Sequence, residues 1–216
     1  MCLILLAWKT VPAQPLVVAA NRDEFHARPA APAAFWEDEP GILAGRDLEA
    51  RGTWMGASRS GRFAAVTNFR GAHEPRAAES RGALVSRFLR NGLPSRSCVE
   101  GIDGNAYSGF NLIVCDGEEL WSMSNRGGAP RRLAPGVYGL GNTVMDAPEV
   151  EGSKQRFAAA LAAGAAVEPL FSVLAQAMIL NPAYGTRCST VSLGRRYAER
   201  SFAPDGAELD TLHYQF

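Results

Sequence analysis

Two apolar runs joined by a short turn open the sequence, where residues 2–24 read CLILLAWKTVPAQPLVVAANRDE. The apolar runs are residues 2–8 and 16–20, and the segment between them contains a lysine and two prolines. Apolar runs of this length, bounded by proline and polar residues, are typical of strands that are buried on both faces. We therefore expect the runs to pair as a hairpin, with the polar residues 21–24 directly after the second strand.

The rest of the chain alternates between strand-like and helix-like segments. Apolar segments bounded by turn residues predict a strand near the C-terminus and strands at residues 53–57, 62–69, 110–115, 119–123 and 188–193. Apolar residues at helical spacing, followed by glycine or asparagine, predict helices at residues 80–90, 153–163 and 169–180. We expect the proline-rich residues 28–40 to form a loop. Paired antiparallel strands, then helices, then strands again indicate an α+β layered domain.

The composition limits the class of protein. Hydrophobic residues make up 47% of the 216 residues, which is ordinary for a globular domain and wrong for a disordered chain. No break in composition divides the chain, so we expect residues 1–216 to form a single domain. The 22 Lys and Arg residues are balanced by 22 Asp and Glu residues, so the formal net charge is zero and a nucleic-acid partner is not expected.

The apolar segments and the cysteines indicate a cellular compartment. The longest apolar stretches, residues 1–8 and 157–167, are shorter than the ~18 to 20 residues that cross a bilayer, so we expect no membrane span. No positively charged region precedes the first stretch, as it would in a secretory signal. The four cysteines share no C-x-x-C spacing, which favours a reducing cytoplasm. The bias toward arginine and alanine indicates a GC-rich, bacterial genome, and no metal or other cofactor is expected because no ligand spacing is present.

Cys2 directly follows the initiator Met1, which is normally removed before so small a residue. Removal would place a thiol of pKa ~8.5 beside an α-amine of pKa ~7.7 to 8.0, so one residue would carry a nucleophile and its own general base. A separate histidine is then unnecessary, and His26, His73 and His213 have no triad-like sequence context. The alternative interpretation is that Cys2 is a small core residue of the first strand.

Arg22 and Asp23 lie opposite Cys2 if the first two strands pair. An arginine near a thiol favours the thiolate, and an aspartate near the α-amine can orient it and hold its charge. Adjacent residues of a strand point to opposite faces, so both can face the thiol only if the strand has already ended, and we favour Asp23. The alternative is an ordinary surface cluster of salt bridges.

Two asparagines are candidate donors to an oxyanion. Asn68 lies near the end of a predicted strand, and Asn142 lies in the glycine-containing residues 139–143. A side-chain amide aimed at a developing oxyanion recurs in acyl transfer and contributes roughly 3 to 4 kcal/mol where measured. Asparagine beside glycine is also ordinary turn chemistry.

Five short motifs follow one another along the chain: Met1-Cys2, Asn21-Arg22-Asp23-Glu24, Thr67-Asn68-Phe69, Gly141-Asn142 and Thr186-Arg187-Cys188-Ser189. Together they resemble the NRDE family, also called the transport and Golgi organisation family, and the resemblance extends over essentially the whole chain. It implies an N-terminal nucleophile hydrolase fold, an α+β four-layer αββα sandwich in which two antiparallel sheets pack face to face between helices.

The family is similar in turn to the cysteine-dependent choloylglycine hydrolases and penicillin V acylases. That resemblance implies a nucleophile, an early arginine and aspartate, two asparagines and a late arginine at Cys2, Arg22, Asp23, Asn68, Asn142 and Arg187. The sequence departs from the pattern at one point, because those hydrolases separate the early arginine and aspartate by two residues and here the pair is adjacent.

Two functions compete. The first is hydrolysis of a non-peptide C–N amide or related acyl bond of a small molecule, through an acyl-enzyme on Cys2. The second follows from the link of eukaryotic relatives to haem mobilisation and acyl-lipid metabolism, which implies a non-catalytic carrier. A carrier would contact its ligand through Cys2, Met55 or a histidine, and Phe35-Trp36 and Thr53-Trp54-Met55 would line an apolar cleft. The same aromatic residues could be plain core.

Overall fold

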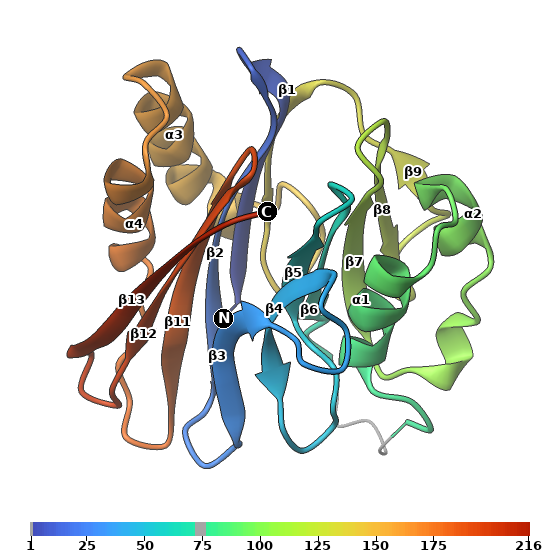
Figure 1. Ribbon diagram of the computed structural model, residues 1–216, viewed down its shortest axis with the longest axis horizontal. Helices are drawn as coiled ribbons and strands as arrows, with labels where there is room; N and C mark the ends of the chain where they lie inside the picture. Colours follow the sequence, from blue (N-terminus) through green and yellow to red (C-terminus); the bar gives the residue numbers. More distant parts are fainter. Residues whose placement is uncertain (1, 72–76) are drawn as a thin grey trace. The chain divides into compact units, whose positions relative to one another are not determined.

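The computed structural model describes residues 2–71 and 77–216, which form two compact units (Figure 1). The first unit comprises Met1–Arg28 and Pro135–Phe216, and the second comprises Pro29–Ala134. Each unit contains one antiparallel sheet and its own helices. The single domain over residues 1–216 stays a prediction.

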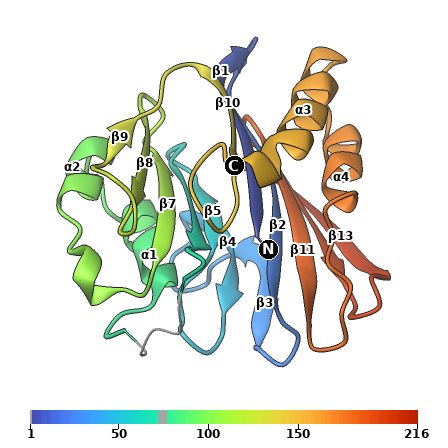
Figure 2. The same cartoon turned by 180° about the vertical axis from the view of Figure 1, so that it is seen from behind.

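The sheet of the first unit has six strands in the order β10-β1-β2-β11-β12-β13. Their bounds are β1 Leu3–Val11, β2 Gln14–Phe25, β10 Gly136–Leu140, β11 Tyr184–Leu193, β12 Arg196–Phe202 and β13 Glu208–Gln215. The helices of this unit are α3, Pro148–Ala162, and α4, Val167–Ala175. Strands from the two ends of the chain therefore share one sheet, with β2 paired to β11 (Figures 1 and 2).

The core of the first unit follows the alternation of its strands. Leu3, Leu5 and Ala7 of β1 belong to one cluster with Phe157 of α3 and Leu170 of α4. Side chains of a strand alternate between the faces of a sheet, so these three residues mark the face that the helices cover. Burial of such apolar surface stabilises the fold by about 25 cal/mol per Å². This packing fixes the helices against the strands that carry the candidate site.

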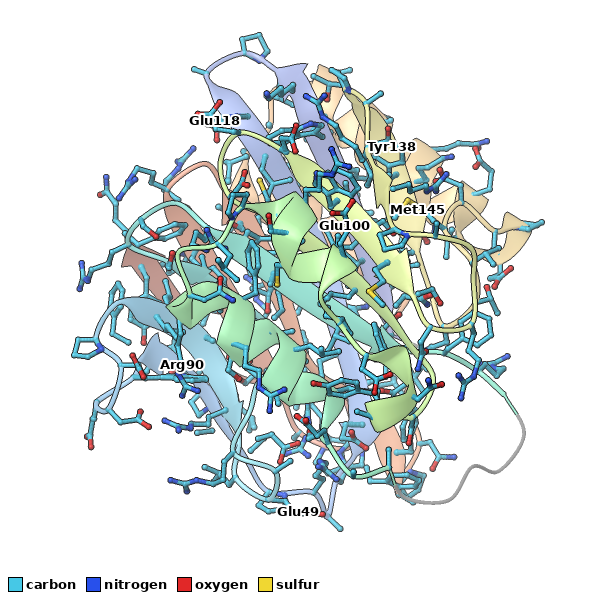
Figure 3. All side chains as sticks on the ribbon, turned by 90° about the vertical axis from the view of Figure 1, so that its right-hand side faces the viewer. Glu49, Arg90, Glu100, Glu118, Tyr138 and Met145 are labelled. Carbon is cyan, nitrogen blue, oxygen red and sulfur yellow. The ribbon has the colours of Figure 1, made fainter. Side chains whose placement is uncertain are left out.

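The sheet of the second unit has seven strands in the order β3-β4-β5-β6-β7-β8-β9. Their bounds are β3 Ala30–Phe35, β4 Ile42–Asp47, β5 Met55–Ser58, β6 Phe63–Asn68, β7 Phe110–Cys115, β8 Leu120–Ser124 and β9 Arg131–Arg132. The helices are α1, Arg81–Arg90, and α2, Ser95–Glu100, with a 3-10 turn at Gly104–Ala106. Figure 3 shows α1 and α2 in front of this sheet, and Arg90 and Glu100, their last residues, are exposed.

Most of the predicted elements are present. The first hairpin is confirmed by the pairing of β1 with β2, and the hairpins β5–β6 and β7–β8 by their registers. The predicted helices correspond to α1, α3 and α4. None of the helices in the described part of the chain is long and apolar enough to cross a membrane.

Three expectations about boundaries are wrong. Residues 21–24 do not follow the second strand but lie inside β2, because β1 pairs with its front part and β11 with its end. Residues 28–40 contain the strand β3, which tolerates its proline because it lies at the edge of its sheet. Helix α4 ends at Ala175, well before residue 180.

Candidate functional site

Cys2 lies immediately before β1, and its thiol is half-buried. Its Sγ donates to the backbone carbonyl oxygen of Asp23 at 3.5 Å. The β1–β2 register pairs Leu3 with Asn21, so the next position along each strand brings Cys2 opposite Arg22. The hairpin therefore places the polar end of β2 beside the thiol, as the sequence predicts.

Arg22 and Asp23 reach Cys2 by different routes. Directly paired residues share a face of the sheet, so the register directs the Arg22 side chain to the face of Cys2 and the Asp23 side chain to the other face. Asp23 contacts the thiol through its backbone carbonyl. Both residues are almost fully buried. The direction of the side chains thus favours Arg22 as the residue whose side chain faces the Cys2 thiol, whereas Asp23 contacts the thiol through its backbone.

The Asp23 carboxylate is held by a neighbouring strand. Thr186 of β11 donates its hydroxyl to Asp23 Oδ1 at 2.6 Å, and the same hydroxyl oxygen accepts the Ile179 backbone N–H at 2.9 Å. The backbone N–H of Thr186 donates to the Ile179 carbonyl at 2.9 Å. Asp23 is therefore fixed to the segment that connects α4 to β11.

Asn21, two residues before Asp23 in β2, is also hydrogen-bonded to distant parts of the first unit. Its Nδ2 donates to the carbonyl of Leu174 in α4 at 3.0 Å, and its Oδ1 accepts the Ser189 hydroxyl at 2.6 Å. Alternate residues of β2 thus bind the chain around α4, while the residues between them face the other way. The four-residue motif combines structural anchoring with the candidate chemistry.

The surroundings of Cys2 control its ionisation. Burial, and then the charge of Asp23, raises the pKa of the Cys2 thiol above its usual value. The charge of Arg22 acts in the opposite direction and lowers this pKa. The thiol is therefore protonated at neutral pH and needs a base before it can act as a nucleophile.

Tyr184, which the sequence does not predict as a site residue, lies beside Cys2 and Asp23. Its hydroxyl donates to the Asp23 carbonyl oxygen at 3.1 Å, the atom that also accepts the Cys2 thiol. Burial, and then the charges of Cys2 and Asp23, raises the pKa of the Tyr184 hydroxyl. The only signal in the sequence was its place just before the motif that begins at Thr186.

Arg187 occupies a bulge in the pairing of β11 with β2. Its Nη1 donates to the carbonyls of Phe25 at 3.0 Å, Arg28 at 3.1 Å and His26 at 3.3 Å. Burial, and then the charge of Arg22, lowers the pKa of Arg187. Arg187 is thus close enough to Arg22 for their charges to repel each other, and its hydrogen bonds hold the backbone at the end of β2 and just after it.

The two candidate asparagines differ in their surroundings. Asn142 is buried and lies two residues beyond Leu140, which pairs with Ile4 of β1. Asn68 ends β6 of the second unit, where it pairs with Phe110 and is exposed. The first unit therefore brings together Cys2, Arg22, Asp23 and Arg187 at one end of its sheet, with Asn142 beyond the neighbouring strand, while Asn68 belongs to the second unit.

The remaining sequence candidates contribute less. Met1 and His73 lie outside the described residues. His26 Nε2 lies 3.1 Å from the carbonyl oxygen of Asn181, and His213 is an exposed residue of β13. Within the described residues, no three or more His, Cys, Asp or Glu side chains gather as a metal site would require.

The fold is shared with solved hydrolases of low sequence identity. Penicillin V acylase from Agrobacterium tumefaciens matches with a TM-score of 0.56 at 13% identity, over 99% of this chain and 86% of that one. A variant of the conjugated bile acid hydrolase from Clostridium perfringens matches with a TM-score of 0.59 at 10% identity, over 99% of this chain and 97% of that one. The chain therefore has the α+β fold of the N-terminal nucleophile hydrolases, which confirms the predicted fold class.

Sequence comparison then gives the family. The family Transport and Golgi organisation 2 matches residues 1–182. The Transport and Golgi organization protein 2 homolog of Bos taurus is 34% identical over 89% of this chain and 88% of its own length. The homolog of Homo sapiens is 32% identical over 100% of this chain and 99% of its own length. The chain belongs to the Transport and Golgi organisation 2 family, as the resemblance predicts.

Proposed function

We propose that the protein is a cysteine-type N-terminal nucleophile hydrolase that cleaves a non-peptide C–N amide or related acyl bond of a small molecule. The observation that carries this proposal is the Cys2 thiol, which touches the Asp23 carbonyl at 3.5 Å beside the buried Arg22. The shared fold supports the proposal because the solved neighbours are named as an acylase and a hydrolase.

The proposed reaction begins once Met1 is removed. The free α-amine of Cys2 accepts the thiol proton, and Sγ forms a bond to the acyl carbon of the substrate. The C–N bond then breaks, its electron pair stays on nitrogen, and the leaving amine takes the proton from the α-ammonium group. Water attacks the thioester, the C–S bond breaks, and the carboxylic acid is released with a regenerated thiol.

The neighbouring residues have distinct proposed roles. Arg22 stabilises the thiolate by its charge, which opposes the rise in the pKa of the thiol. Asp23 orients the α-ammonium group, and Asn142 donates to the oxyanion. Arg187 holds the backbone after β2 and so acts as a positioning residue. The role of Asn68 as a second oxyanion donor rests on the family resemblance alone.

The decisive experiment combines mass measurement with a chromogenic acyl panel. Purified protein of known intact mass is mixed with a series of acyl p-nitroanilides, and a burst of p-nitroaniline followed by slow turnover is expected. Cys2→Ala, Cys2→Ser and a form that retains Met1 should lose turnover and keep the fold. Cys98→Ala, which removes a half-buried thiol of the second unit, is the matched control and should keep activity. Full activity in a Cys2 variant or with Met1 retained would refute the scheme.

A carrier function is the competing outcome of this test. The relatives are named for transport and Golgi organisation, not for hydrolysis. The proposed ligand-contacting residues favour the hydrolase, because Trp36 lies in the core of the second unit, where its indole N–H donates to the Ala44 carbonyl at 3.0 Å, and Met55 is fully buried. A Soret band on haem titration that disappears in a Cys2 variant, with no acyl adduct, would favour the carrier.

We also propose a cytoplasmic location and a small-molecule partner. All four cysteines, Cys2, Cys98, Cys115 and Cys188, are free thiols, which a reducing compartment preserves. The bacterial origin stays a prediction that rests on composition.

A further inference from the structure

A thiol and a hydroxyl group donate hydrogen bonds to the same backbone atom, the carbonyl oxygen of Asp23. The Cys2 thiol donates to it at 3.5 Å and the Tyr184 hydroxyl at 3.1 Å. The proposed reaction assigns a role to Cys2 and to the Asp23 carboxylate, but none to Tyr184. The Tyr184 hydroxyl therefore shares its hydrogen-bond acceptor with the nucleophile, and the mechanism has not used it.

The contacts of Tyr184 and Asp23 fix this arrangement. Tyr184 is paired with Phe25 across β2 and β11, and their rings pack edge to face with centroids 5.2 Å apart. The Asp23 carboxylate is bound to the Thr186 hydroxyl at 2.6 Å. Neither the ring nor the peptide group can turn freely, so the hydroxyl stays directed at the carbonyl oxygen.

The carbonyl oxygen has opposite effects on the two forms of the sulfur. It stabilises the thiol because it accepts the S–H proton, and a hydrogen bond to the neutral form disfavours ionisation. It repels the thiolate because the negative end of its dipole then faces a negative sulfur. A hydroxyl proton bound to the same oxygen weakens both effects, since it places a positive hydrogen beside the oxygen.

We propose that Tyr184 is a positioning residue for the nucleophile, whose hydroxyl occupies the Asp23 carbonyl and so makes it easier for the Cys2 sulfur to lose its proton and turn toward the substrate. This inference rests on the proposed role of Cys2. No covalent bond to Tyr184 forms or breaks, and the thiol proton still goes to the α-amine. Tyr184 itself remains neutral in the range of the reaction, because burial raises the pKa of its hydroxyl.

Other charged groups around the thiol must stay constant in a test of this idea. The charges of Asp23 and Arg22 act on the Cys2 thiol. Those of Asp23, Glu24 and Arg22 act on the Tyr184 hydroxyl, and Arg187 of β11 interacts with Arg22. Arg22 lies 3.9 Å from Glu24, between Nη2 and Oε2. Replacement of Tyr184 by phenylalanine changes none of these charges and keeps the ring that packs on Phe25.

The test measures the pH dependence of alkylation of Cys2. The protein, Tyr184→Phe and Tyr214→Phe are treated with iodoacetamide from about pH 6 to about pH 10, which spans the ordinary thiol pKa. The modified Cys2 peptide is quantified by mass spectrometry, apart from the peptides of the other cysteines. Tyr214 lies on β13 of the same sheet and supplies the matched control.

We expect Tyr184→Phe to raise the midpoint of Cys2 alkylation and to slow the rate near neutral pH by roughly three- to tenfold, the change that half to one pKa unit produces. Tyr214→Phe should change neither. An unchanged midpoint in Tyr184→Phe overturns the inference, because a merely structural residue would not shift it. If Tyr184→Phe does not fold, Phe25→Leu loosens the ring and keeps the hydroxyl; a raised midpoint supports the inference and an unchanged one overturns it.

The readout separates this inference from the proposed function, because alkylation needs no substrate. Hydrolysis that survives in Cys2→Ala would refute the proposed function whatever Tyr184→Phe does to the thiol. Loss of hydrolysis in Cys2→Ala, together with an unshifted midpoint in Tyr184→Phe, would overturn the role of Tyr184 alone.

Discussion

Among the residues that the structure describes, each unit contains one nearly buried arginine, and the two arginines differ in what surrounds them. Arg22 of the first unit is 6% exposed and Arg62 of the second is 8% exposed. Arginine is rarely buried unless its charge and donors are satisfied. The kind of partner that each guanidinium finds therefore tells which arginine belongs to a reactive site.

Arg62 is bound by neutral oxygens. Its Nε donates to the Phe88 carbonyl at 3.0 Å, and its Nη2 donates to the Leu93 carbonyl at 2.7 Å and to Asn91 Oδ1 at 3.3 Å. The guanidinium also lies 3.9 Å from the centroid of the Phe88 ring. These contacts gather at the C-terminal end of α1, where a positive charge is favourable. Arg62 thus fixes the helix end.

Arg22 faces groups that can change their charge. Its Nη2 lies 3.9 Å from Glu24 Oε2. Its charge acts on the pKa of the Cys2 and Cys188 thiols and of Arg187. The comparison teaches that burial of an arginine does not mark a site by itself. Ionisable neighbours do not mark a site by themselves either, because the charges of Asp116, Cys98 and Cys115 act on Arg62 as well. What identifies the structural role of Arg62 is that its hydrogen bonds hold carbonyl oxygens at the end of α1.

The largest effect should come from Arg62→Met. The buried Phe88 carbonyl and the partly buried Leu93 carbonyl would lose their donor. A buried acceptor without a donor costs about 1 to 3 kcal/mol. We expect the free energy of unfolding in urea to fall by about 3 kcal/mol, while the alkylation midpoint of Cys2 stays unchanged. A loss below about 1 kcal/mol would contradict the structural role.

Asn21→Ala should come next. It removes the donor to the Leu174 carbonyl and the acceptor of the Ser189 hydroxyl, so both groups stay buried without this partner. We expect the free energy of unfolding to fall by about 2 kcal/mol. The exposed Asn105→Ala, measured in parallel by urea unfolding, should stay within about 0.5 kcal/mol of the parent protein. Equal effects of the two variants would show that Asn21 is no anchor.

Arg22→Met should act on reactivity more than on stability. Because the charge of Arg22 lowers the pKa of the Cys2 thiol, its loss should raise that pKa and slow iodoacetamide alkylation near neutral pH by up to about tenfold. Glu24, the acid beside Arg22, is partly exposed, so its charge stays solvated when the guanidinium is lost, and we expect a smaller change in stability than for Arg62→Met. An alkylation profile identical to that of the parent protein would show that Arg22, like Arg62, has no effect on the reactivity of Cys2.

The smallest effect should come from an exposed arginine pair, Arg46 with Asp38. Arg46 Nη2 donates to Asp38 Oδ2 at 2.8 Å, and this hydrogen bonding lowers the pKa of Asp38 to about 2. A carboxyl whose pKa is lower when folded stabilises the fold above its unfolded pKa of about 3.9 and loses that contribution as the pH falls through about 2. Asp38→Asn should remove this acid-dependent part of the thermal midpoint and change little near neutral pH. An unaltered acid dependence would show that the pair contributes nothing.

The sequence predicted the hairpins because their signals are local. The φ of +84° at Gly61 and of +99° at Gly117 is the conformation that a glycine allows in a tight turn, and both glycines stand between apolar runs. The prediction that residues 21–24 follow the strand was wrong because pairing with β11 extends β2 through them. Thr186 and Asp23, which are hydrogen-bonded in this pairing, lie more than 160 residues apart in the sequence. No local pattern contains that contact.

The same reason limited the prediction of the site. Cys2, Arg22 and Asp23 come together through one hairpin, so a register drawn from the sequence was enough to find them. Tyr184 enters only through the β2–β11 pairing, and its surrounding residues carry no periodic pattern. The predicted helix at residues 169–180 overran for a related cause, since the backbone of Ile179 pairs with Thr186 and leaves the helical path.

The two-residue loop of the first hairpin constrains how relatives can vary. Val11 pairs with Gln14, so only Pro12 and Ala13 connect the strands, and Ala13 has a φ of +58°. A bulge between Trp8 and Val11 already takes up one residue ahead of this loop and keeps Asn21 opposite Leu3. A relative whose loop is one residue longer or shorter therefore needs such a bulge, because an uncompensated step would exchange the sides of Asn21 and Arg22 and separate anchoring from chemistry.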